Sequence, residues 1–383
     1  MKWDVAVVGA GPTGSRVAYH LAGLGFGVAV LERRPDIGGK AACTGIIGRE
    51  CAEAFAIDET TILRQADSAT LFSPSGNRIK LHREEPQAYI LDRAAFNRAM
   101  AQRARSQGAE YYLNTPVESI KSADDKVTIE TARGNFAARA AVIAAGFGSG
   151  LTDGLGKFAD FTAGAQAEVE SKSSEVEVYF GREVAPGFFA WLVPTSPGKA
   201  RVGLLSRENP TLYLKRLLAS LAADGKIASA EVGINHGAVP LKPLPRTYGD
   251  RLLVVGDAAG HVKPTTGGGI YYGLLGADIA ARTLHKALQS NDLSARSLAR
   301  YEREWQQLLG RELRTGYWAR KLFEKLSDRQ IDNIFDIVKR NGIDEALLKE
   351  KDLSFDWHSK AILKLLGHQV VASAVNVFRL PRN

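Results

Sequence analysis

Glycines at fixed spacing give the chain its first recognisable chemistry. Gly9, Gly11 and Gly14 follow a strand-like apolar run, and Glu32 ends the next apolar run. Gly9 permits the tight turn, Gly11 lets the backbone approach a pyrophosphate, and Gly14 lets the next helix pack on the strand. The free amides at that helix start then face phosphates, and Glu32 can accept hydrogen bonds from ribose hydroxyls. The pattern predicts a dinucleotide site.

A second glycine-rich segment extends this site. Gly256 and Asp257 follow a Leu-Leu-Val-Val run, and Asp257 can reach a ribitol or ribose hydroxyl. Gly267–Gly269 open a long helix, where bare N–H groups can bind the O2 edge of a flavin and stabilise the charge of its reduced form. The segment from Gly146 to Gly150 lacks the spacing of another fingerprint. One tightly held long dinucleotide predicts FAD, and its electrons must come from a transient donor.

Cysteine and histidine usage excludes several other chemistries. The only two cysteines, Cys43 and Cys51, form neither a disulfide framework nor a metal-ligand cluster, and they suit a reducing compartment. We expect Cys51 to be a core thiol. His82, His236 and His261 are dispersed without metal or triad spacing. His261 is expected near the flavin, at the surface or in a structural role.

Composition limits the class of protein. The 383 residues suffice for two or three structural units, and the net charge of +8 favours anionic partners. Acids are interspersed among the basic residues, so we expect no nucleic-acid role. We also expect no secretory signal and no spanning helix. We therefore expect a cytoplasmic protein. The mostly apolar stretch 361–378 allows either a helix on a membrane surface, giving peripheral contact, or one packed on its own domain or on a second subunit.

Hydrophobic periodicity predicts an α/β protein. Residues 1–32 form a β-α-β unit, 33–67 are loop-rich, and 93–106 and 269–288 are helical. Strands are expected at 69–73, 78–81, 110–113, 127–131, 135–138, 140–145, 175–180, 188–193, 200–205 and 251–257, with a helix near 212–222.

These elements predict a discontinuous, Rossmann-like FAD-binding domain with a parallel sheet. It comprises residues 1–67, 89–158 and 240–290. An antiparallel-sheet substrate domain comprises 68–88 and 159–239, and 291–383 form a helical C-terminal region.

Motifs over about residues 1–290 resemble the FAD-dependent hydroxylase superfamily. They are the fingerprint with Glu32-Arg33, the stretch Leu91–Arg93, and Gly256-Asp257 followed by Pro264 and Gly267–Gly269. The resemblance implies a FAD domain interleaved with a sheet-based substrate domain. It also implies that Arg93 helps to hold the FAD phosphates. The alternatives for Arg93 are a partner for Asp92 or a solvated charge.

One subgroup of this superfamily resembles the chain more closely than the superfamily as a whole. Pro186–Pro194 resembles the substrate-domain motif of geranylgeranyl reductases, Pro-x-x-Tyr-x-Trp-x-Phe-Pro, with Phe189 in place of Tyr and Val193 in place of Phe. The segment from Lys199 to Gly203 and the loop Lys40–Gly45 are also similar to that family, in which the cysteine-containing loop lies near the flavin. The Tyr hydroxyl is absent from this chain.

This resemblance implies hydride transfer from reduced flavin to an isolated C=C bond of a polyprenyl group. Such an alkene needs an acid in a dry pocket, and Cys43 is either that proton source, a wall of the flavin site or an inert thiol. A prenyl chain is held by buried apolar area and aromatic walls. Strand alternation places Phe189 and Trp191 on one face and Phe188 on the other, unless these aromatics are plain sheet core.

The expected site residues follow from these motifs. Cys43 is the expected catalytic residue. The expected cofactor-binding residues are Gly9, Gly11, Pro12, Thr13, Gly14, Glu32, Arg33, Lys40, Ala42, Cys43, Arg93, Val117, Gly256, Asp257, Gly267, Gly268, Gly269 and Ile270. The expected substrate-binding residues are Phe189, Trp191, Pro194 and Pro264, and no metal is expected.

The sequence allows several substrates and more than one class of reaction. The prenyl group could sit on a diphosphate, an ether lipid, a quinone or a pigment, and the donor could be NADPH or a ferredoxin-like protein. The shared cofactor motifs also allow a flavin monooxygenase. Residues 190–194 are similar to the Trp-x-Trp-x-Ile-Pro motif of flavin halogenases, with Phe189 replacing the first Trp. A flavin-binding factor without enzymatic activity is a further alternative.

Overall fold

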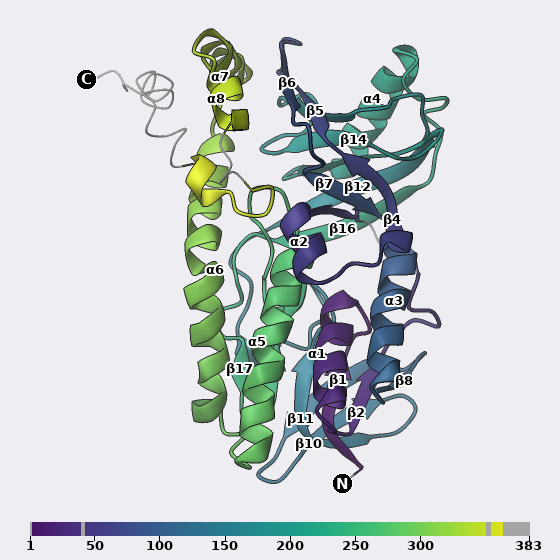
Figure 1. Cartoon of the computed structure of the whole chain (residues 1–383), viewed down its shortest axis with the longest axis vertical. Coiled ribbons are helices and arrows are strands. Elements are labelled where there is room, and N and C mark those ends of the chain that lie inside the picture. The colour runs from purple at the N-terminus through teal and green to yellow at the C-terminus, as the bar shows by residue number, and fades with distance from the viewer. Residues whose placement is uncertain (1, 40–42, 350–353, 363–383) are drawn as a thin grey trace, which may run out of the picture. The chain divides into compact units, whose positions relative to one another are not determined.

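The computed structural model describes residues 2–39, 43–349 and 354–362 (Figure 1). The chain forms two compact units. The first contains the described residues of Met1–Lys40, Asp92–Phe161 and Ala238–Leu313, and the second those of Ala41–Leu91, Thr162–Gly237 and Arg314–Asn383. Apart from boundary shifts of two or three residues, this division differs from the expected one at two places. Residues 43–67 belong to the second unit, and the helical region after residue 290 is divided between the units.

A largely parallel sheet forms the centre of the first unit. Its strands run in the order β17-β18-β11-β1-β2-β8, and the four pairs from β18 to β8 are parallel. An antiparallel hairpin of β9 and β10 extends it beside β11. Val5, Val7 and Val142 have no exposed surface, as expected for a sheet covered on both faces. The strands are β1 (Trp3–Val8), β2 (Val28–Leu31), β8 (Glu110–Tyr112), β9 (Val117–Ser122), β10 (Val127–Thr131), β11 (Phe136–Ile143), β17 (Tyr248–Gly249) and β18 (Leu252–Val254).

Helix α1 (Pro12–Gly23) of this unit packs against two other helices, α3 (Arg93–Ser106) and α5 (Ile270–Gln289), as Figure 1 shows. Helix α3 begins where the sequence predicts, because the Asp92 carboxylate accepts hydrogen bonds from the amides of Ala94 at 2.9 Å and Ala95 at 3.0 Å. Helix α6 (Ala295–Phe323) also starts in this unit.

A seven-stranded sheet forms the second unit, in the order β16-β12-β15-β14-β13-β5-β6. The pairs described between neighbours from β12 to β6 are antiparallel except for the parallel pair of β13 and β5. Helix α4 (Pro210–Ala223) covers one face with four buried leucines. The strands are β5 (Ser68–Phe72), β6 (Arg78–His82), β12 (Phe161–Glu170), β13 (Val176–Phe180), β14 (Phe189–Ser196), β15 (Lys199–Ser206) and β16 (Ile234–Pro240).

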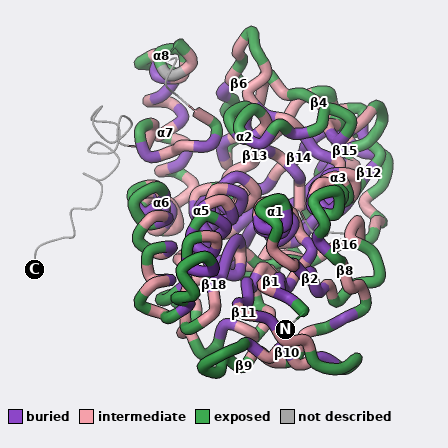
Figure 2. The backbone as a smooth tube through the Cα atoms, turned by 60° about the horizontal axis from the view of Figure 1, so that its bottom comes forward, coloured by how far each residue is buried: buried purple, intermediate pink, exposed green. Residues whose placement is uncertain are grey.

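A smaller three-stranded sheet completes this unit, in the order β3-β7-β4. Its strands are β3 (Ile46–Gly48), β4 (Ile62–Ala66) and β7 (Ala88–Leu91), and the accompanying helices are α2 (Arg49–Ala54), α7 (Asp328–Arg340) and α8 (Ile343–Lys349). The buried residues of α7 form a core with those of β6 and α8. Figure 2 colours the backbone by burial, and its purple segments include much of α5 and the strands around β1.

The predicted fold class is confirmed, but several local predictions are wrong. Residues 33–67 contain two strands and a helix rather than mainly loop, and β9 was not predicted. The two strands expected at 135–138 and 140–145 are the single strand β11, which tolerates Arg139 because its guanidinium donates to Asp4 and to the Leu288 carbonyl at 3.0 and 2.8 Å. Phe188 precedes β14 instead of belonging to it.

No helix among residues 2–39, 43–349 and 354–362 is long and apolar enough to cross a bilayer. Within the same part, no group of three or more His, Cys, Asp or Glu residues could hold a metal ion. The stretch 361–378 lies almost entirely outside the described residues.

Candidate active site

The glycine turn after β1 has the geometry that a bound dinucleotide requires. Gly9 has a φ of +108°, and a Cβ there would lie 2.4 Å from the Ala144 carbonyl oxygen. A Cβ on Gly14 would lie 2.1 Å from the Gly9 oxygen, so neither position accepts a side chain. Around Gly11 a Cβ would meet nothing within 4 Å, which leaves the backbone open to a ligand. Pro12 starts α1, and no side chain caps it, so its first amides are available to phosphates.

Glu32 lies immediately after β2 and is fixed against this turn. One carboxylate oxygen accepts a hydrogen bond from the Ala10 amide at 2.9 Å, and the other accepts from the Arg34 amide at 3.0 Å. The carboxylate is therefore oriented before any ribose binds. Arg33 beside it is exposed.

The start of α5 converges on the same turn. Thr13 of α1 lies so close to Gly256 and Gly273 that a Cβ on either glycine would be 3.0 or 2.7 Å from its hydroxyl oxygen. A Cβ on Gly269 would lie 2.4 Å from a carboxylate oxygen of Asp257. Helix α5 begins at Ile270 after Gly269, without a side-chain cap. Two uncapped helix starts therefore belong to one site in the first unit.

Asp257 and Arg93 set the electrostatics of this site. Burial raises the pKa of the Asp257 carboxyl, and the positive charge of Arg93 opposes that rise. The Nε and Nη1 atoms of Arg93 are buried and have no hydrogen-bond partner, while the guanidinium lies 5.6 Å from the Phe96 ring. Buried arginine donors normally bind an anion or a carbonyl. The unpartnered donors, the open backbone at Gly11 and the uncapped helices together fit the phosphates of FAD.

For the other expected residues described in the first unit, the structure shows a position but no feature that points to a ligand. Val117 is half-buried at the start of β9, where it pairs with Thr131 and packs against the core that contains Leu31 and Ile129. Pro264 is buried inside the turn that the Gly267 amide closes by donating to the Lys263 carbonyl at 2.8 Å. Gly268 is half-buried in that turn. The expected residues Lys40 and Ala42 lie outside the described residues.

His261 is fully buried, and neither ring nitrogen has a hydrogen-bond partner. Its ring centroid lies 4.9 Å from that of Trp305, and a Cβ on Gly276 would lie 2.4 Å from its Nδ1. Burial lowers the pKa of His261 to about 3, so the ring is neutral at physiological pH. Complete burial excludes the expected surface role, and this environment favours the structural role over one near the flavin.

An aromatic wall lies on one face of β14 in the second unit. The ring centroid of Phe189 lies 6.0 Å from that of Trp191 and 6.1 Å from that of Phe180. Trp191 covers Gly203, where a Cβ would lie 2.6 Å from its Cζ2. The alternating residues Ala190 and Leu192 are fully buried in the core under α4.

Two neighbouring residues do not join this wall. Pro194 is buried and, by strand alternation, falls on the same face as Ala190. Phe188 is buried under the Arg320 guanidinium, 4.1 Å from its ring centroid. The strand therefore contributes Phe189 and Trp191 to the wall.

Cys43 is a half-buried free thiol at the start of a loop that β15 and β12 hold in place. The next residue, Thr44, donates its hydroxyl to the Gln166 side chain at 2.9 Å, and its carbonyl accepts from Arg201 at 2.7 Å. Arg201 also donates to the Leu91 carbonyl at 3.1 Å. Cys51 is completely buried in α2, as expected for a core thiol.

Sequence reasoning missed Gln166 and Arg201 as supports of the cysteine loop. The available signal was an arginine inside the otherwise apolar run of β15, where it is only 8% exposed. An arginine in that position needs carbonyl or carboxylate partners, and these come from distant parts of the chain.

Comparison with known proteins defines the class. The chain matches the FAD dependent oxidoreductase family over residues 4–59 and 48–223, which is more than half of its length. It is therefore an FAD-dependent oxidoreductase, and the cofactor and enzyme class expected from the two glycine segments are confirmed.

The relatives narrow this class. The chain is 33% identical over 355 residues to digeranylgeranylglycerophospholipid reductase 2 of Methanothermobacter thermautotrophicus, covering 87% of this chain and 90% of that protein. It is 32% identical over 366 residues to the digeranylgeranylglycerophospholipid reductase of Methanocaldococcus jannaschii, covering 89% and 92%. The chain belongs to the geranylgeranyl reductase family, as the motifs around Cys43 and Trp191 predict.

Solved structures agree with this assignment. A geranylgeranyl bacteriochlorophyll reductase-like protein from Thermoplasma acidophilum has a TM-score of 0.85 and 25% identity, covering 98% of this chain and 99% of that one. The halogenase PltM has a TM-score of 0.72 with 16% identity, which shows a likeness of fold alone.

Proposed function

We propose that this enzyme saturates C=C bonds of geranylgeranyl groups carried by a lipid. The names of its relatives, digeranylgeranylglycerophospholipid reductases, support that substrate class. The structural observation that carries the proposal is the aromatic wall of Phe189 and Trp191, for which Gly203 leaves room. A prenyl chain offers no polar handle, so rigid aromatic surfaces and buried area must hold it.

Different residues of the chain bind different parts of FAD. The Gly9–Gly14 turn and Arg93 hold the pyrophosphate of FAD, while Asp257 and the start of α5 hold its ribityl and flavin ends. Bound FAD supplies the hydride. Phe189 replaces the tyrosine of the family motif, so at this position the wall lacks a hydroxyl. Water exclusion around the alkene then depends on apolar side chains.

Cys43 is the proposed proton donor to the second alkene carbon, from its Sγ. The loop that carries it is anchored through Thr44 by Gln166 and Arg201. Anchoring of this kind holds the thiol at a constant position through repeated turnovers. A Cys43→Ser variant that keeps full turnover would remove this assignment and leave the reductase proposal intact.

The reducing equivalents come from a transient donor, either NADPH or a ferredoxin-like protein. We propose that the enzyme works in the cytoplasm, peripherally at the membrane that contains its lipid substrate.

The decisive experiment uses the anaerobic, dithionite-reduced holoenzyme. A geranylgeranylated glycerophospholipid is added in detergent, flavin reoxidation is followed by absorbance, and the lipid is analysed by mass spectrometry. Reoxidation without oxygen, with two hydrogens gained per double bond, is expected. A flavin that stays reduced until oxygen enters, followed by oxygen insertion into a substrate, contradicts the proposal and indicates a monooxygenase.

A further inference from the structure

One face of α6 presents arginines to solvent along most of its length. Successive residues of an α-helix are rotated by about 100°, so five exposed arginines, Trp318 and the exposed Gln307 fall within a sector of about 80° that runs for about 33 Å. We call the arginines and the tryptophan of this sector the α6 stripe, which comprises Arg296, Arg300, Arg303, Arg311, Arg314 and Trp318. Leu298, Trp305 and Leu309 lie on the opposite side of the helix and are buried.

Acidic side chains do not neutralise the stripe. Glu304 pairs with Arg300 at 2.6 Å. Glu302 is directed toward the protein, because its carboxylate accepts from the Thr247 amide and hydroxyl at 2.8 and 3.0 Å. Glu312 lies about 140° around the helix from the middle of the stripe. In the described part of the chain, Arg303, Arg311 and Arg314 have no ion pair, so the face keeps a net positive charge.

Exposed apolar side chains accompany the charge. Trp318 is 70% exposed at the C-terminal end of the stripe, and Leu308, about 100° around the helix from the middle of the stripe, is 44% exposed. An indole in water next to arginines is typical of helices that lie at a membrane interface, where the ring enters the headgroup region and the guanidinium groups meet phosphates.

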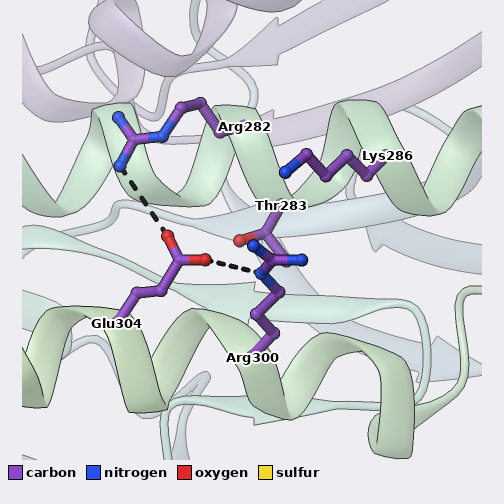
Figure 3. A pocket seen from close by; sticks show the side chains of 5 residues that line it. All are labelled: Arg282, Thr283, Lys286, Arg300 and Glu304. Carbon is purple, nitrogen blue, oxygen red and sulfur yellow. Dashed lines mark hydrogen bonds and ion pairs between the residues drawn. The ribbon is translucent and has the colours of Figure 1, made fainter.

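A small pocket between α5 and α6 adjoins the stripe through Arg300 (Figure 3). Arg282 and Lys286 of α5 and Glu304 of α6 also line it, with Arg282 3.8 Å from Glu304. At its base lies Thr283, only 5% exposed, whose hydroxyl oxygen is buried and has no hydrogen-bond partner. A hydroxyl donor surrounded by three cations and one carboxylate is suited to a phosphoryl oxygen.

We propose that the α6 stripe and this pocket bind the surface of an anionic lipid bilayer. One lipid phosphate occupies the pocket, and Trp318 enters the interface. The proposal rests on the proposed function only in that the substrate is a lipid. A straight row of arginines over about 33 Å matches a flat anionic surface, and the exposed indole favours a bilayer over an acidic protein partner.

The test is cosedimentation of the FAD-loaded enzyme with phosphatidylglycerol–phosphatidylcholine vesicles and with pure phosphatidylcholine vesicles. The stripe variant carries Arg303→Gln, Arg311→Gln and Arg314→Gln. The matched control carries Lys126→Gln, Arg133→Gln and Lys172→Gln, which removes the same charge from exposed positions elsewhere. Each arginine near an anionic surface increases the affinity about fivefold. Because three arginines are replaced, the stripe variant should bind anionic vesicles about a hundredfold more weakly than the control.

Two further variants test the details. Vesicles with brominated acyl chains should quench the fluorescence of the wild type more than that of Trp318→Phe. Thr283→Val should weaken binding to anionic vesicles without changing the thermal midpoint by more than a few degrees. Flavin absorbance and circular dichroism establish that every variant is folded and loaded.

Equal binding of the stripe and control variants overturns the proposal, as does equal binding of the wild type to neutral and anionic vesicles. An acidic electron-transfer protein that distinguishes the two variants when vesicles do not would identify the stripe as a protein interface instead. Vesicle binding is measured without turnover, so it can fail or succeed independently of the reductase assay. With a water-soluble prenyl diphosphate, the stripe variant should keep wild-type turnover.

Discussion

Replacing Arg93 with methionine should separate FAD affinity from the stability of the apoprotein. Its Nε and Nη1 atoms are buried without partners, so the guanidinium contributes little to the fold until an anion arrives. Methionine has a similar length and keeps the contact with Phe96, but it cannot donate a hydrogen bond.

The structure sets the size of both effects. A hydrogen bond to a charged group contributes about 1.5–3 kcal/mol, so loss of the phosphate contact should raise the Kd of FAD by roughly 10- to 200-fold. In the apoprotein, the substitution removes two buried donors that have no hydrogen-bond partner, which stabilises the fold. It also removes the attraction between the charges of Arg93 and Asp257, which destabilises the fold. These changes oppose each other, and the free energy of unfolding should stay within about 1 kcal/mol of the wild type.

FAD affinity is measured by titrating apoprotein with FAD and following the flavin fluorescence, and stability by urea unfolding of the apoprotein. Arg93→Lys should recover only part of the affinity, because an ammonium lacks the planar fork of arginine. Arg133→Met, at an exposed turn, is the control and should change neither quantity. An unchanged Kd for Arg93→Met, or an apoprotein weakened by about 3 kcal/mol or more, would refute the reasoning.

Three other changes follow from the same geometry. Gly203→Ala places a Cβ 2.6 Å from Trp191 Cζ2, so urea unfolding should show a loss of about 1–3 kcal/mol and turnover should shift toward shorter prenyl chains. Arg201→Met should increase the alkylation rate of Cys43 by iodoacetamide without changing FAD content, and an unchanged rate would contradict the anchoring role. Burial raises the folded-state pKa of Asp257, so its ionised form costs stability at neutral pH and this cost disappears as pH falls toward the unfolded value of about 4. Asp257→Asn apoprotein should therefore exceed the wild type in urea resistance at neutral pH, with a difference that shrinks in acid; a constant difference would refute this.

Elements with strong local signals were predictable. The β-α-β unit, helix α3 with its Asp92 cap, the strand before Gly256 and the start of α5 are all encoded by short segments whose periodicity and capping residues determine their conformation. The same holds for β14 and β15, whose alternating residues divide between core and aromatic wall.

Elements that depend on distant partners were not predictable. Strand β9 is stabilised by pairing with β10, and β3 and β4 exist because β7 lies between them. Their isolated sequences carry little preference, since strand pairing and burial decide short strands. Arg139 interrupted the expected apolar strand because its partners on Asp4 and the Leu288 carbonyl are far away in sequence.

The sequence alone determined the cofactor and the family, because a phosphate-binding turn and an aromatic substrate motif need particular residue types at short, fixed spacings. Tertiary structure decided which residues support them. It left the donors of Arg93 buried without partners and joined Thr44 to Gln166 and Arg201. It also buried the side of α6 opposite its arginines, so that a spacing already present in the sequence became one exposed face. Such arrangements arise from packing between segments that lie far apart in the chain, and a local motif does not encode that packing.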